Sequence, residues 1–191
     1  MIVDRVKKLT DFRFVNLFSA RYTDRKSNEK EWIFASRSAG DNPLEQRKST
    51  PDAVVIVPFH EQEQKLLLIK EYRVPLGGFQ YGFPAGLVDS GESVEAAGRR
   101  ELFEETGLTV DRIVRISPRV FSTSGLTDES VSMMFVHCSG EPTSRHNESS
   151  EEIEPVWFSK EDAAAVLFDP TLQFDVKTWI VLQAFSGTGQ I

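Results

Sequence analysis

The N-terminal part of the chain alternates apolar and polar residues in short stretches, which is the pattern of half-buried strands. A partly alternating stretch runs from Phe12 to Phe18, and a second β-rich stretch occupies residues 30–37. The polar run at 23–29 between them suits a hairpin loop. Residues 10–37 are therefore predicted to form a strand pair, followed by a polar link at 38–51.

Strands and helices are expected in turn over the rest of the chain. Two β-rich runs, at 53–59 and 65–70, precede a Gly/Pro-rich stretch at 75–91. Further strands are expected at 113–117, 131–138 and 156–158. This order predicts the α/β class, with a mixed α/β sandwich that carries an N-terminal β extension.

Capping residues mark the expected helices. Ser93 suits the N-cap of a helix that ends at Thr106, because a serine oxygen can accept a hydrogen bond from a free N–H of the first turn. Gly107 suits the position just after the helix end. Ser159 opens a second helix with a capping-box-like start, and a last helix is expected at 171–184.

Composition limits the classes of protein that fit. The length of 191 residues can bury a sizeable core without a disulfide or a structural metal. Cys138 is the only cysteine, which favours a reducing compartment, and no apolar run approaches the length of a membrane span. The N-terminus lacks the apolar core of a signal peptide, so a cytoplasmic protein with no membrane partner is expected.

The net charge of −7 argues against broad nucleic-acid binding, which depends on excess positive charge. It also means that any phosphate site needs local cations, either metal or arginine.

One helix supplies carboxylates for such a metal. Glu101, Glu104 and Glu105 are spaced i, i+3, i+4, so they share a helix face on which like charges repel by ~0.2–0.5 kcal/mol per pair.

A bound Mg²⁺ or Mn²⁺ would turn that repulsion into ligation, because hard cations prefer oxygen ligands. Arg100 lies four residues before Glu104 and can pair with it. On spacing alone, a solvated acidic helix face is the competing interpretation. The upstream Gly86 and Gly91 favour the metal, because they allow a tight loop whose carbonyls can face the carboxylates, and Pro84 stiffens the entry.

The whole segment resembles the Nudix box, which is Gly, five residues, Glu, seven residues, Arg-Glu, an apolar and any residue, Glu-Glu, any residue, Gly and an apolar residue. The matching positions are Gly86, Glu92, Arg100, Glu101, Leu102, Glu104, Glu105, Gly107 and Leu108. Seven of them are fixed identities, so a chance match at a given start is on the order of 10⁻⁸. The chain is therefore expected to belong to the Nudix hydrolases.

The resemblance implies a Nudix-type α/β/α sandwich with a divalent metal, Mg²⁺ or Mn²⁺, as cofactor. Glu101 and Glu105 would be the leading metal ligands, Glu104 a further one, and the Ala85 carbonyl an oxygen from the loop. Glu104 and Glu105 thereby count among the catalytic residues, whereas the Arg and the first Glu of the box would be mainly structural. The implied reaction is attack of water on phosphorus of a nucleoside diphosphate derivative.

The flanking segment from Glu71 to Glu92 resembles the ADP-ribose pyrophosphatase branch of that family. That resemblance implies that Arg73 contacts phosphate, that Trp32 stacks on adenine and that Arg37 reaches the diphosphate, often from a partner subunit. An ordinary half-buried strand aromatic is the alternative for Trp32, and a surface salt bridge is the alternative for Arg73. The expected substrate is ADP-ribose or a related ADP-sugar, which would give AMP and a sugar phosphate.

The N-terminal extension, residues 1–45, has little core of its own, and residues 46–191 would form the Nudix domain. Packing the extension on a second subunit would stabilise it, and enzymes of this branch are typically dimers. A homodimer is therefore expected.

In this branch the catalytic base is usually a Glu on a mobile loop after the box. Here that loop is the stretch from Glu141 to Glu154, and Glu151 suits the role best by its distance from the following strand at 156–158. Glu152 and Glu148 are the alternatives.

Two positions depart from the branch pattern. Gly82 stands where a Glu is usual, and Ser124 stands where a Pro is usual. Another nucleoside diphosphate sugar or a dinucleotide is therefore an alternative substrate. A non-catalytic ADP-ribose-sensing domain and an RNA-processing Nudix enzyme are competing functions, disfavoured by the intact glutamates and the acidic charge respectively. His60, His137 and His146 show no metal-ligand spacing and are assigned no role.

Overall fold

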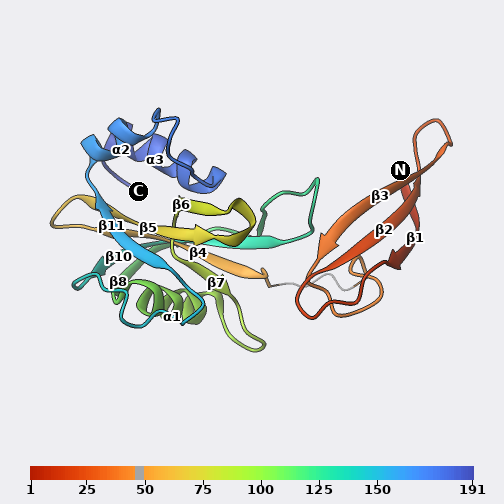
Figure 1. Ribbon diagram of the computed structural model, residues 1–191, viewed down its shortest axis with the longest axis horizontal. Helices are drawn as coiled ribbons and strands as arrows, with labels where there is room; N and C mark the ends of the chain where they lie inside the picture. The colour runs from red at the N-terminus through yellow and green to blue at the C-terminus, as the bar shows by residue number, and fades with distance from the viewer. Residues whose placement is uncertain (46–49) are drawn as a thin grey trace. The chain divides into compact units, whose positions relative to one another are not determined.

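The computed structural model describes residues 1–45 and 50–191, which divide into two compact units (Figure 1). The first unit consists of Met1–Asp52 and Arg119–Val131, and the second of Ala53–Pro118 and Ser132–Ile191. The predicted domain boundary between residues 45 and 46, and part of the predicted link at 38–51, fall outside the described residues.

An antiparallel sheet of order β1-β2-β3 forms the main body of the first unit. Its strands are β1 (Ile2–Lys8), β2 (Asn16–Thr23) and β3 (Glu29–Ser36). Phe18 and Phe34 face each other across β2 and β3 with their rings stacked 5.8 Å apart, and with Ala20 they make the small core of this sheet. The predicted hairpin at 23–29 is confirmed.

Two details of this sheet differ from the sequence prediction. β1 was not predicted, because most of its side chains are exposed and its apolar pattern is weak. The stretch before Asn16 is not a strand, because the Asn16 side chain bonds both backbone groups of Phe12 at 2.6 and 2.9 Å and closes a loop. Phe12 and Phe14 are consequently exposed.

The second unit is built on a sheet whose strands follow the order β11-β5-β4-β10-β8. Their bounds are β4 (Ala53–His60), β5 (Lys65–Arg73), β8 (Thr109–Ile116), β10 (Ser130–Ser139) and β11 (Ile153–Phe158). In Figure 1, α1 (Val94–Thr106) covers one face of this sheet, and α2 (Lys160–Val166) with α3 (Val176–Thr188) covers the other. The predicted α/β/α sandwich is therefore confirmed.

The stretch 75–91, predicted only as Gly/Pro-rich, contains short elements. They are the 3-10 turn η1 (Val74–Leu76), β6 (Gly78–Gly82) paired with β5, and β7 (Ala85–Leu87) paired with β4. A further short strand, β9 (Val120–Phe121), pairs with the start of β10 inside the first unit. These elements are too short to show a period in the sequence.

Caps define the helices of the second unit. The capping box of Ser159 and Asp162 opens α2 as predicted. The last helix was predicted to begin at 171, which is wrong by five residues. It begins at Val176, because the Asp175 carboxylate accepts hydrogen bonds from the backbone N–H groups of Lys177 and Thr178.

The main core of the second unit fixes α1 against the sheet. Its fully buried members come from α1 and from the strands beneath it: Val54, Ile56, Leu67, Ala97, Leu102, Leu108, Met134, Val136 and Cys138. Each Val, Ile, Leu or Met side chain among them contributes roughly 1.5–3 kcal/mol when it is withdrawn from water. Gly98 allows the close approach, because a Cβ there would lie 2.3 Å from the Met134 methyl. This packing gives the opposite face of α1 a fixed orientation.

Within residues 1–45 and 50–191, no helix is long and apolar enough to cross a membrane.

Candidate active site

The helix α1 is bounded by the residues that the sequence indicated. Ser93 accepts a hydrogen bond from the backbone N–H of Ala96, and Gly107 ends the helix in the left-handed region at φ 73°. Leu102 lies in the core, so the side chains one residue before and three residues after it are held at the edge of β7. Those two side chains are Glu101 and Glu105.

Glu105 is a buried carboxylate, with 6% of its surface exposed. Its Oε2 accepts a hydrogen bond from the backbone N–H of Ala85, at 3.1 Å. Burial is the main cause that raises the pKa of Glu105 to about 9; the charges of Glu101, Glu71 and Glu151 act in the same direction, and the Ala85 hydrogen bond acts against them. An acid in this environment ionises at neutral pH only when a cation compensates its charge.

Glu101 lies directly under Gly86. A Cβ at position 86 would lie 1.9 Å from the Glu101 carboxyl carbon, so only glycine leaves room for this side chain. Burial raises the pKa of Glu101, whereas its bond to Arg100 lowers it, and the charges of Glu104 and Glu151 add to the rise. Two carboxylates, one buried and one partly buried, thus contact the strand β7.

Arg100 holds the acidic residues of the box in place. Its guanidinium binds both oxygens of Glu92, at 3.1 and 3.2 Å, and also binds Glu101 at 2.7 Å and Glu104 at 3.1 Å. It donates a further hydrogen bond to the Leu87 carbonyl. The predicted pair of Arg100 and Glu104 is confirmed. The bonds to Glu92 raise the pKa of Arg100, and Arg100 lowers the pKa of Glu92.

The three glutamates of α1 differ in exposure. The side chains of Glu101 and Glu104 are 13% and 49% exposed, so Glu104 is at the surface while Glu101 and Glu105 are inside. Among the described residues, no three His, Cys, Asp or Glu side chains form a group that could hold a metal ion. In this arrangement Arg100 binds Glu101 and Glu104, and the backbone of Ala85 binds Glu105.

The donor set nevertheless fits a hard divalent cation. Carboxylate oxygens are the ligands that Mg²⁺ and Mn²⁺ prefer, and burial of Glu105 and Glu101 beside further acids demands positive charge. Arg100 binds Glu101 and Glu104, and a rotation of these two carboxylates away from Arg100 would free their oxygens for a cation beside Glu105. Such rotations cost far less than an uncompensated buried charge.

Glu151 and Arg73 lie in the same unit as the box. Glu151 acts electrostatically on both Glu101 and Glu105, which places its charge near theirs. Its Oε2 accepts a hydrogen bond from the backbone N–H of Glu148, at 2.9 Å. Arg73 pairs with Glu71 at 2.6 Å, and Glu71 also raises the pKa of Glu105.

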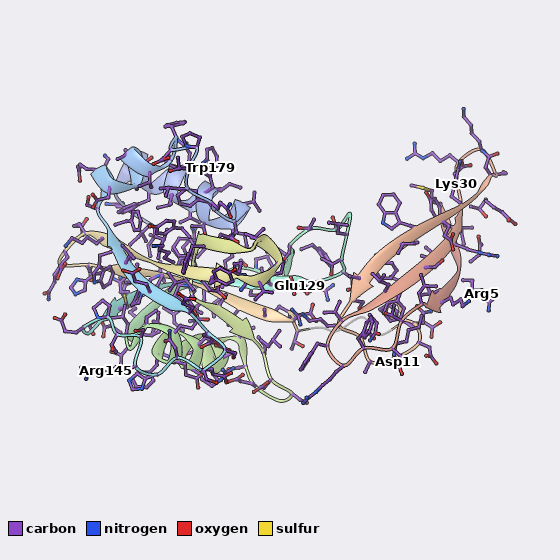
Figure 2. The ribbon with its side chains drawn as sticks, viewed as in Figure 1. Arg5, Asp11, Lys30, Glu129, Arg145 and Trp179 are labelled. Carbon is purple, nitrogen blue, oxygen red and sulfur yellow. The ribbon has the colours of Figure 1, made fainter. Side chains whose placement is uncertain are left out.

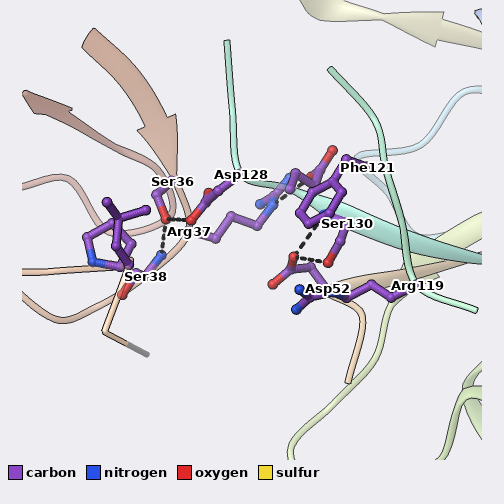
Figure 3. A pocket seen from close by; sticks show the side chains of 11 residues that line it. Ser36, Arg37, Ser38, Asp52, Arg119, Phe121, Asp128 and Ser130 are labelled. Atoms are coloured by element: carbon purple, nitrogen blue, oxygen red, sulfur yellow. Dashed lines mark hydrogen bonds and ion pairs between the residues drawn. The ribbon is translucent and has the colours of Figure 1, made fainter. Parts of the chain in front are cut away.

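Trp32 and Arg37 lie in the first unit. Trp32 is 50% exposed on β3, and its indole N–H donates to the Gly125 carbonyl at 3.2 Å. Arg37 forms an ion pair with Glu129 at 3.1 Å. Arg37 also lines a pocket of about 310 Å³ that lies wholly in this unit (Figure 3).

Sequence reasoning missed that pocket. Its wall includes Arg119 and Phe121 of the 119–131 segment, together with Asp52, whose carboxylate accepts hydrogen bonds from the backbone and the hydroxyl of Ser130 (Figure 3). These residues come from segments far apart in the chain, so no spacing in the sequence connects them. Arg37 was the only member that a motif could indicate.

The two departures from the branch pattern also have defined surroundings. Gly82 ends β6, and a Cβ there would lie 3.6 Å from the Asp175 carboxylate. An acidic group therefore already lies beside the position at which a Glu was expected. Ser124 is exposed in a turn in which the N–H of Leu126 donates to the Thr123 carbonyl.

Comparison with known proteins shows the family of the chain. The family model for the NUDIX domain matches residues 49–179. A putative Nudix hydrolase 2 of Caenorhabditis elegans is 36% identical over 129 residues, 64% of this chain and 56% of that protein. An ADP-ribose pyrophosphatase of Saccharomyces cerevisiae is 31% identical over 141 residues, 69% of this chain and 55% of that protein.

A crystal structure of an ADP compounds hydrolase shares the fold. It superposes with a TM-score of 0.74 at 22% identity, over 100% of this chain and 96% of that chain. The matches to the worm and yeast proteins, by contrast, span little more than half the length of those relatives.

Proposed function

Because the chain belongs to the Nudix family, we propose that it hydrolyses the pyrophosphate bond of a nucleoside diphosphate derivative with the help of a divalent metal ion. The substrate class that we propose is ADP-ribose or a related ADP-sugar, which would yield AMP and a sugar phosphate. Relatives that carry the names ADP-ribose pyrophosphatase and ADP-sugar pyrophosphatase support this choice.

The single observation that carries the proposal is the buried carboxylate pair beside the glycine loop. Glu105 is inside the protein with a pKa near 9, and Glu101 lies under Gly86 with a raised pKa. A purely structural helix would not need two acids in these positions, because each costs free energy to bury. Their placement is explained when they hold a cation.

Glu101 and Glu105 would hold the metal, with Glu104 and the Ala85 carbonyl as further oxygen donors. When bound, Mg²⁺ or Mn²⁺ supplies positive charge against the diphosphate and makes water a better nucleophile. Glu92 and the Leu87 carbonyl keep Arg100 beside these glutamates, and their bonds to Arg100 do not depend on the metal.

Glu151 is the proposed general base. It is partly exposed on the loop before β11, where water can reach it, and its charge lies near Glu101 and Glu105. In this role its carboxylate takes the proton of the attacking water, so the oxygen that attacks phosphorus carries a developing negative charge. Arg73 would contact the diphosphate after exchanging its bond to Glu71 for one to phosphate.

We also propose that the enzyme is a cytoplasmic homodimer in which the first unit supplies Trp32 and Arg37 to the substrate. The support is the small core of the sheet β1-β2-β3 and the half-exposed indole of Trp32. A monomer at micromolar concentration in light scattering, together with full activity after deletion of residues 1–40, would contradict this part of the proposal.

A substrate panel tests the proposed function. The wild-type chain is incubated with ADP-ribose, GDP-mannose, UDP-glucose, NADH and dinucleoside polyphosphates, with Mg²⁺, with Mn²⁺ or with EDTA, and products are separated by chromatography. Release of AMP from ADP-ribose, lost in EDTA, is the expected result. Preference for another panel member would move the substrate to the alternatives that Gly82 and Ser124 favour. Hydrolysis of none of them with either metal would overturn the proposal.

A further inference from the structure

The loop between β10 and β11, residues 140–152, is attached to the C-terminal end of α1. The backbone N–H of Thr143 donates to the Thr106 carbonyl at 2.8 Å. Thr143 also occupies the space beside Gly107, because a Cβ on that glycine would lie 2.4 Å from the Thr143 methyl. Gly107 therefore both ends the helix and admits this loop.

A ring stack makes a second attachment one turn earlier on α1. Phe103 and His146 lie with ring centroids 4.7 Å apart and an interplanar angle of 27°. Both side chains are exposed, so the stack lies on the surface and its loss leaves the core intact. Phe103 is the residue between Leu102 and Glu104, a position that the Nudix box leaves free.

The loop then returns to the sheet through a turn that carries Glu151. The Asn147 amide donates to the Ile153 carbonyl at 3.3 Å, and the Tyr72 N–H donates to the Glu152 carbonyl at 3.0 Å. Between these bonds, the Glu151 N–H donates to the Glu148 carbonyl at 3.0 Å. Glu151 is thus five residues from the His146 ring along a loop that is attached on both sides.

We propose that the stack of Phe103 on His146 fixes the loop so that Glu151 stays beside the carboxylates of α1. The two residues are positioning residues, because they act on the reaction only through Glu151. The inference rests on the proposed function, in which Glu151 accepts the proton of water. The electrostatic effect of Glu151 on Glu101 and Glu105 agrees with the position that the stack would maintain.

Arg145 provides a test that does not depend on activity. It is exposed in the loop immediately before His146 and is labelled in Figure 2. Trypsin can cut after Arg145 only when the loop leaves α1, so the rate of this cleavage reports the open fraction. Phe103→Ala keeps the cleavage sequence intact. The loss of an aromatic pair should shift the loop toward the open state by about 2- to 12-fold, so cleavage should rise by up to about 12-fold.

Matched variants control for nonspecific effects. His60→Ala removes another ring contact, the edge-on pair of His60 and Trp157 at 5.6 Å, and should leave cleavage after Arg145 at the wild-type rate. Phe103→Tyr keeps the ring and should restore the wild-type rate. Equal cleavage of wild type and Phe103→Ala, measured by mass spectrometry without added metal, would overturn the attachment.

Kinetics separate positioning from a general structural role. Phe103→Ala should lower kcat by up to about 12-fold with KM nearly unchanged, and the fall in kcat multiplied by the rise in cleavage should be about 2- to 12-fold. In a Glu151→Gln background the same change should alter kcat by less than about 2-fold, because no base is left to position. Equal losses in both backgrounds would contradict the inference.

The failures of the two proposals are distinguishable. A wild-type chain that hydrolyses no panel member overturns the proposed function. An active wild-type chain whose Phe103→Ala variant keeps both its kcat and its cleavage rate overturns this inference alone.

Discussion

The box helix α1 of the second unit and the segment from Trp32 to Arg37 of the first unit both carry residues proposed for the active site, but they hold them differently. On α1, Glu105 is 6% exposed and Arg100 bonds three glutamates at once. On β3, Trp32 is half exposed, and directly after this strand Arg37 forms an ion pair with Glu129. The residues on α1 are thus fixed by burial and ion pairs, whereas Trp32 and Arg37 are open to solvent.

This difference shows which kind of role each region suits. Glu105 is buried and accepts a hydrogen bond from the Ala85 N–H, so it keeps its position without a ligand and preorganises one side of a cation site. A half-exposed indole and a single surface ion pair are weakly held, since such pairs contribute only about 0–1 kcal/mol. Changes on α1 should therefore act on kcat, and changes on the sheet should act on substrate binding.

The largest effect is expected for Glu105→Gln. The substitution keeps the shape and the hydrogen bond from Ala85 but removes the charge that would hold the metal. We expect kcat to fall by more than about 10⁴-fold, because metal and activated water are lost together. Circular dichroism should show an unchanged fold, and near-wild-type turnover would sink the metal assignment.

The next largest effect is expected for Glu151→Gln, which tests whether this loop residue is the general base. General-base help is worth about 10²–10⁴-fold, so kcat should fall within that range while KM changes little. Glu152→Gln and Glu148→Gln are the matched controls on the same loop. If one of them loses kcat while Glu151→Gln keeps it, the role passes to that neighbour, and if none matters, Glu104 is the next candidate.

A smaller and different effect is expected for Trp32→Ala in the first unit. Stacking of a base on an aromatic ring is worth about 1–3 kcal/mol, which corresponds to a rise in KM of about 5- to 150-fold with kcat nearly unchanged. Ile33→Ala, at the exposed neighbour on the other face of β3, is the matched control. A fall in kcat without a rise in KM would contradict the expectation that Trp32 acts on substrate binding and α1 on kcat.

Sequence alone predicted the features that depend on residues close together in the chain. Ser93, Gly107 and the glutamates of α1 act within one helix, where spacing fixes geometry. The α/β/α sandwich followed from the order of strands and helices. Gly86 was recognised as part of the motif, and the structure adds its reason, since no Cβ fits above Glu101.

Features that depend on tertiary contacts were beyond that reasoning. His146 was assigned no role, because its partner Phe103 is 43 positions away and the pair has no spacing rule. The burial of Glu105 relative to Glu104 depends on the position of β7 and not on the helix period. Strand β1 and the late start of α3 were missed because a side-chain cap or a weak pattern decided them.

A divalent-metal site on α1 should make the stability of the folded chain depend on both pH and Mg²⁺, and this dependence is the most direct test of the site. In the folded chain without metal, burial raises the pKa of Glu105 to about 9, above the ordinary value of 4.5. The protonated form is therefore favoured by folding. The contribution of this protonation to the free energy of unfolding is complete below about pH 4.5 and is lost as pH rises through about 9.

The measurement is the Tm of wild type and Glu105→Gln from pH 5 to 9, in EDTA and in Mg²⁺. In EDTA the wild-type Tm should fall relative to that of the variant as pH rises, because only wild type has this buried acid to ionise. Mg²⁺ should remove that relative fall and raise the wild-type Tm at pH 8–9 without raising the variant's. Parallel curves in EDTA, with equal Mg²⁺ shifts in both proteins, would contradict the account.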